Sequence, residues 1–166
     1  MRGLISTLIL ICTTAAAGPA MAQATAVGQH GDWGVYSYQA GNGKVCYAMS
    51  VPKAKEPASL DHGDIFFFVS QKPGQNVASE PQFIASYNFQ ESSKVTATIG
   101  DRAFSLFTQG KSAWLENAAE EPQLIAAMKG GSTMKIAAKS GRGNATSYVF
   151  SLGGVTAAID ATKNCK

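Results

Sequence analysis

Most of the chain alternates between apolar and polar residues with a period of two, the pattern of strands that turn one face to a core. This alternation is clearest in residues 45–51, 83–89, 94–99 and 133–139. Residues 65–69 are apolar on both faces and predict a strand in the middle of a sheet or under a helix, with both faces buried. Turn signals separate the runs, at residues 41–43, 72–74, 100–101 and 140–144. Many short strands joined by such turns indicate an antiparallel β-sandwich.

Two short segments depart from the alternation. Residues 120–130 begin with an acidic pair and Pro122, which suit the first turn of a helix, and end on glycine. Residues 155–164 place apolar side chains three and four positions apart, which predicts a second short helix. Residues 53–61 and 71–80 are expected to form longer surface loops, where binding functions concentrate. Residues 53–64 together with 71–80 are the candidate interaction surface.

The first 22 residues have the features of a cleaved secretory signal peptide. Arg2 supplies the positive charge, residues 4–17 form a mostly apolar stretch, and Ala20-Met21-Ala22 fits an A-x-A cleavage site. We therefore expect residues 23–166 to form a single domain, which is periplasmic or is secreted and associated with the cell surface. No other stretch is long and apolar enough to span a membrane as a helix, so no transmembrane segment is expected after cleavage.

Export changes how the cysteines are interpreted. Cys12 leaves with the signal peptide, so Cys46 and Cys165 are the cysteines of the mature chain. An oxidising compartment favours a disulfide between them. The alternative, a reactive redox pair, lacks the C-x-x-C spacing that lowers a thiol pKa.

Composition argues against several classes of function. The full chain has 14 basic and 11 acidic side chains without a long run of one sign, which does not favour a nucleic-acid-binding protein. Its two histidines, His30 and His62, are too few for an ordinary zinc or copper site. We therefore expect no metal and no cofactor.

Two places carry candidate interaction chemistry. Asp61, His62 and Asp64 place an imidazole between two carboxylates just before the buried strand at residues 65–69. A simple turn, in which an aspartate accepts from nearby backbone amides, explains the same residues. Arg142 lies at the tip of the predicted turn at 140–144, where it could meet an anionic partner. No G-x-S-x-G nucleophile elbow is present, so no catalytic residue is assigned.

A set of ordered motifs connects the chain to a known family. They are Gly31-Asp32-Trp33, Cys46-Tyr47-Ala48, Ser112-Ala113-Trp114, Ala127-Met128-Lys129-Gly130, Ser140-Gly141-Arg142-Gly143 and Ser151-Leu152-Gly153-Gly154. In this order they resemble the invasion-associated locus B family of exported bacterial proteins, from Asp32 to Cys165. The resemblance implies an all-β, immunoglobulin-like antiparallel sandwich, here with one or two short helices. It supplies no catalytic residues, and it does not by itself assign a role in invasion.

These observations favour a non-enzymatic binding module of the cell envelope, with a protein or cell-wall partner. A sandwich carries variable loops on a rigid frame, and such loops serve binding more readily than catalysis. The first alternative is a periplasmic small-molecule-binding or stress-response protein, which a pocket with a few convergent polar groups would favour. A hydrolase with a dispersed site is the third candidate, and His62 is the first residue to inspect for it.

Overall fold

The computed structural model describes residues 23–41, 43–72 and 77–163. In this part of the chain, eleven strands form one continuous antiparallel sheet in the order β1-β2-β3-β5-β6-β9-β8-β7-β10-β11-β4. The strands are β1 (Thr25–His30), β2 (Trp33–Ala40), β3 (Gly43–Ser50), β4 (Ala54–Glu56), β5 (Ile65–Lys72), β6 (Val77–Ala85), β7 (Lys94–Ile99), β8 (Arg102–Gln109), β9 (Ser112–Leu115), β10 (Thr133–Lys139) and β11 (Ala145–Ser151).

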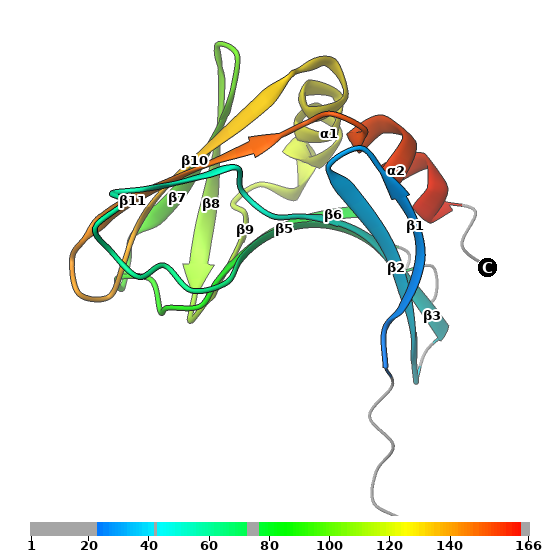
Figure 1. The fold of residues 1–166 in the computed structure, drawn as a ribbon, viewed down its shortest axis with the longest axis horizontal. Coiled ribbons are helices and arrows are strands. Elements are labelled where there is room, and N and C mark those ends of the chain that lie inside the picture. The colour runs from blue at the N-terminus through cyan, green and yellow to red at the C-terminus, as the bar shows by residue number, and fades with distance from the viewer. Residues whose placement is uncertain (1–22, 42, 73–76, 164–166) are drawn as a thin grey trace, which may run out of the picture.

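The sheet folds over on itself, so that its second half covers its first (Figure 1). Contacts between aromatic rings show this packing directly. The Phe150 ring of β11 lies 6.0 Å from that of Phe67 on β5, and the Tyr148 ring lies 5.5 Å from that of Phe83 on β6. All four side chains are completely buried between the two layers. The sandwich predicted from the alternation is therefore confirmed.

Two short helices complete the core. Helix α1 (Glu121–Gly130) carries proline in its first turn and buries Leu124 and Met128, as its sequence predicts. Helix α2 (Val155–Lys163) buries its apolar face and packs against β1, β2, β3 and β5. The two helices contact each other, and Lys129 of α1 forms an ion pair of 2.8 Å with Asp160 of α2. Both predicted helices are confirmed.

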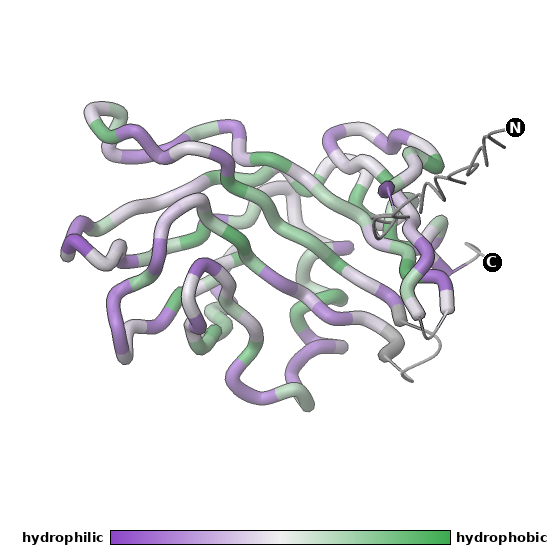
Figure 2. Tube along the Cα trace, turned by 90° about the horizontal axis from the view of Figure 1, so that it is seen from below, coloured by the Kyte–Doolittle hydropathy of each residue, from purple (hydrophilic) through white to green (hydrophobic). Residues whose placement is uncertain are grey.

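The strand predicted to be buried on both faces differs from expectation. Phe67 is fully buried, and β5 does lie between β3 and β6 in the sheet. However, Phe66 and Phe68 lie on the outer face, where they are only partly buried and their ring centroids are 5.8 Å apart. In Figure 2, hydrophobic and hydrophilic residues alternate along many strands, as expected when one face is wetter than the other.

The two predicted surface loops are also corrected. Residues 53–61 contain the short strand β4, which pairs with β11. Residues 71–80 include the end of β5 and the start of β6, while 73–76 lie outside the described residues. The two segments lie at opposite ends of β5, which are about 23 Å apart at the usual rise of a strand. They therefore do not form one shared surface.

Some predictions concern parts of the chain that the structure does not describe. The proposed signal peptide and Cys165 lie outside the described residues. Cys46 is buried on β3, and α2, which packs on this strand, has its last described residue at Lys163. The Cys46–Cys165 disulfide therefore stays a prediction. Among the described residues, no helix has the length and apolar character that crossing a membrane requires.

Candidate binding pocket

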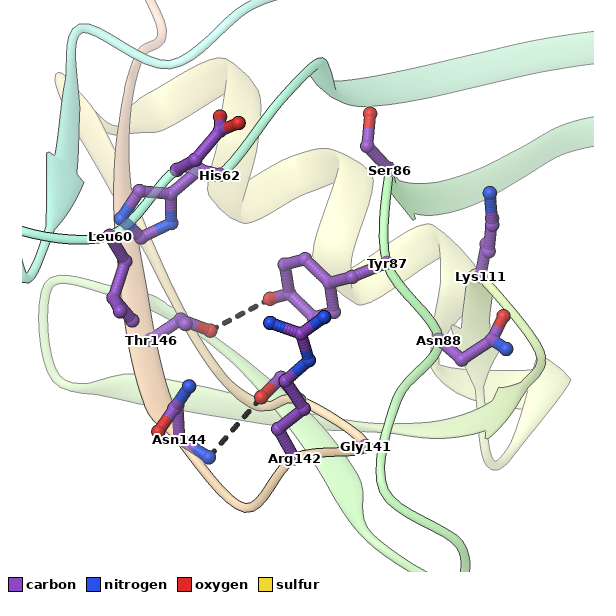
Figure 3. A pocket seen from close by; sticks show the side chains of 12 residues that line it. Leu60, His62, Ser86, Tyr87, Asn88, Lys111, Gly141, Arg142, Asn144 and Thr146 are labelled. Carbon is purple, nitrogen blue, oxygen red and sulfur yellow. Dashed lines mark hydrogen bonds between the residues drawn. The ribbon is translucent and has the colours of Figure 1, made fainter.

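A pocket of about 730 Å³ opens at the end of the sandwich where five stretches of chain meet (Figure 3). These are the segment before β5, the segment after β6, the β8–β9 turn, the β10–β11 turn and the start of β11. The lining is mostly polar. It consists of Leu60, Asp61, His62, Ser86, Tyr87, Asn88, Lys111, Ser140, Gly141, Arg142, Asn144 and Thr146.

One wall forms where strand β6 ends earlier than its sequence pattern predicts. The alternation runs on to Phe89, but the strand ends at Ala85. The Ser86 hydroxyl there donates to the Asp64 carbonyl at 2.9 Å and accepts from the Asp64 amide at 2.8 Å. This side chain takes the place of ladder hydrogen bonds and releases residues 86–88 to line the pocket. Sequence periodicity cannot show this, because Asp64 is distant along the chain.

The far end of this wall, at residues 88–89, is hydrogen-bonded to the β10–β11 turn. The Gly141 amide donates to the Asn88 carbonyl at 2.7 Å, and Phe89 forms an isolated bridge with Ser140. Within the turn, the Asn144 amide donates to the Ser140 hydroxyl at 3.2 Å (Figure 3). The predicted turn at 140–144 is confirmed, and it forms one edge of the pocket.

His62 is held in the floor by two hydrogen bonds and is only 6% exposed. Its Nε2 lies 3.0 Å from the Pro57 carbonyl oxygen, and its Nδ1 lies 2.9 Å from the Tyr148 hydroxyl. A carbonyl only accepts, so Nε2 carries the hydrogen. In the neutral imidazole, Nδ1 then accepts from the hydroxyl of Tyr148. The tautomer follows from the partners rather than from the sequence.

The hydrogen bonds continue from the floor toward the pocket as a chain. The Tyr87 hydroxyl lies 2.9 Å from that of Tyr148 and 2.7 Å from that of Thr146. The Thr146 hydroxyl also donates to the Ala138 carbonyl at 3.4 Å, so His62, Tyr148, Tyr87 and Thr146 form one connected hydrogen-bond network. Burial, followed by the hydrogen bond with Tyr87, raises the pKa of the Tyr148 hydroxyl well above its usual value. Tyr148 therefore remains a proton donor at physiological pH.

The rim carries the charged groups. Arg142 lies at the exposed tip of the β10–β11 turn, and its side chain extends toward Tyr87 (Figure 3). Lys111 comes from the β8–β9 turn and is also exposed. Within the described part of the chain, neither side chain has a hydrogen bond or an ion pair. Both cations are therefore available to a ligand.

The candidate interaction residues from the sequence divide into two groups. Asp61, His62 and Arg142 meet at this pocket, although His62 and Arg142 are eighty residues apart. Asp64 does not line it. Asp61 Oδ1 accepts from the Gly63 amide at 3.0 Å, so the turn that explained these residues is also present.

Sequence reasoning missed several members of the site. Tyr148 reads as one more inward residue of a strand, and Tyr87 as part of the alternation that ends in Phe89. The one available signal was Thr146, a buried threonine in the same inward row as Tyr148 and Phe150. A hydroxyl in an inward row requires a hydrogen-bond partner, and Thr146 has two here, the Tyr87 hydroxyl and the Ala138 carbonyl.

Several polar side chains of the pocket are already hydrogen-bonded within the protein. His62 uses both ring nitrogens, and the Ser86 and Ser140 hydroxyls are bonded to backbone groups. Among the described residues, no three histidine, cysteine, aspartate or glutamate side chains gather where they could hold a metal ion.

The fold and pocket define a class of all-β sandwich proteins with a polar pocket at one end. The chain belongs to the Invasion associated locus B (IalB) protein family, whose model matches residues 33–163. Its fold is similar to the crystal structure of invasion associated protein b from Bartonella henselae, with a TM-score of 0.58 and 13% identity over 83% of this chain and 96% of that chain. A comparison with curated protein sequences gave no match.

Proposed function

We propose that the protein is an exported, non-enzymatic binding module of the cell envelope that engages a protein or cell-wall partner at this pocket. The observation that carries the proposal is the contrast between a fixed floor and an available rim. His62, Tyr148 and Tyr87 are connected by buried or partly buried hydrogen bonds, whereas the Arg142 and Lys111 side chains have no hydrogen bond or ion pair among the described residues. A rigid floor with available polar groups at the rim favours binding, because little has to be ordered when a ligand arrives.

One further feature supports this function. The signal-peptide features of residues 1–22 support export, in agreement with the family to which the chain belongs. The second candidate function is that of a periplasmic small-molecule-binding protein. The volume of the pocket, about 730 Å³, favours it, since this is the range of sites for small molecules. Both functions use the same rim residues.

The experiment that tests the proposal is photo-crosslinking in the native bacterium from a single position at the rim. A photoreactive residue at Asn144 faces the pocket, and one at the exposed Ala126 of α1 serves as the control. We expect one reproducible adduct from the probe at Asn144. The probe at Ala126 should not form this adduct, and Arg142→Gln should reduce its yield from Asn144. Equal capture from both positions, or no capture from Asn144 despite full incorporation of the probe, would refute the proposal that the partner binds at this pocket.

A further inference from the structure

We infer that the pocket binds a monocarboxylate that also carries hydrogen-bond donors, such as an acidic sugar or the C-terminal end of a peptide. This inference rests on the proposed function and names the chemistry of the group that the pocket recognises.

The charge of the lining indicates an anion. Arg142 and Lys111 contribute two positive charges and Asp61 one negative charge, so these three side chains together carry one net positive charge. A guanidinium presents parallel N–H donors that match a carboxylate, and the exposed Arg142 can place them over the pocket. One net positive charge suits a monoanion better than the dianion of a phosphate monoester.

The remaining groups indicate what else the ligand carries. Asp61 uses Oδ1 for the Gly63 amide, and its second oxygen can accept from a ligand hydroxyl or N–H. Asn88 and Asn144 offer side-chain amides at the rim, and neither amide group has a hydrogen bond among the described residues. The ligand should therefore combine a carboxylate with donors, as uronic acids and peptide termini do. A purely apolar ligand would leave these groups unsatisfied.

The test compares probes that differ only at the carboxylate. D-glucuronate and D-glucose share a sugar ring, and N-acetyl-alanyl-alanine and its C-terminal amide share a peptide. Each is titrated into the mature protein by calorimetry. We expect one carboxylate of the two pairs to bind at least tenfold more tightly than its neutral partner, and the pair that discriminates identifies the source of the group.

Substitutions then test whether the ligand carboxylate binds to Arg142. Arg142→Gln should weaken binding of the carboxylate about tenfold or more, as the loss of a charge-assisted hydrogen bond would, and it should leave the neutral partner unchanged. Lys135→Met removes an exposed charge of β10 that does not line the pocket and should have no effect. No discrimination in either pair, or no effect of Arg142→Gln, would overturn the inference. Partner capture from Asn144 together with that result would retain the binding function and discard the carboxylate.

Discussion

Removing either end of the His62–Tyr148 hydrogen bond should destabilise the protein by an amount that the structure allows us to work out. His62→Leu removes a buried ring that forms two hydrogen bonds, one of 2.9 Å with the Tyr148 hydroxyl and one of 3.0 Å with the Pro57 carbonyl. Each such bond contributes about 1 kcal/mol, so we expect a loss of about 2 kcal/mol. Tyr148→Phe leaves the buried Nδ1 without a donor, which also costs about 2 kcal/mol.

The double variant His62→Leu, Tyr148→Phe tests whether the two residues act together. Both single variants lose the same bond, so the double variant should lose about 3 kcal/mol rather than the additive 4 kcal/mol. The assay is urea unfolding of all four proteins, with equal dependence on urea concentration as the check that the comparison is valid. Tyr36→Phe removes a hydroxyl on the outer face that has no hydrogen bond among the described residues, and should change stability by less than about 0.5 kcal/mol.

A coupling energy of zero between His62 and Tyr148 would refute this reasoning. Additive losses would mean that each hydroxyl and ring nitrogen finds another partner once its neighbour is gone. The hydrogen-bond network of Thr146, Tyr87 and Tyr148 would then not hold the floor of the pocket.

Three further predictions follow from separate features. Gly154→Ala should abolish most of the folded protein in thermal melts, because its Cβ would overlap the backbone carbonyl oxygen of His30 at a φ of +93°. Gly130→Ala has open space around its Cβ and should be neutral or slightly stabilising. Hydrogen bonds from two lysines lower the pKa of Asp160 from 3.8 to about 2, so its stabilising contribution is present at neutral pH and disappears as the pH falls from about 4 through 2. Asp160→Asn should therefore be less stable than the parent in urea at pH 7 and equal to it near pH 2. Thiol titration of the denatured, unreduced exported protein should find no free Cys46 or Cys165, and two thiols would exclude the disulfide.

The fold could be predicted because local patterns carry it. Period-two alternation identified strands in the regions of β3, β7 and β10, since each has one face in the core. Pro122 and a C-terminal glycine marked the bounds of α1. Strands β1, β4, β8 and β9 were not predicted. Strand β1 is an exposed edge strand, so no buried face imposes an alternation on it.

The pocket could be predicted only in part, because its geometry depends on contacts between distant segments. The turn chemistry of Asp61 and the exposed position of Arg142 are local and were visible in the sequence. The early end of β6 depends on Ser86 bonding to Asp64, and the bonds of His62 depend on Tyr148, 86 residues away. No periodicity within one strand records such pairings.

The division between floor and rim explains how one scaffold of this family can serve binding. The floor is built from buried partners, so changing Tyr148 or His62 should reduce stability and affinity together. The rim side chains of Arg142 and Lys111 are exposed, so changing them should alter affinity while the free energy of unfolding stays within about 0.5 kcal/mol. Holding each long rim side chain on a ligand costs about 0.5–1.5 kcal/mol, which is small beside a charge-assisted bond of about 1.5–3 kcal/mol. Ligand preference in this pocket can therefore change through the rim without disturbing the sandwich that supports it.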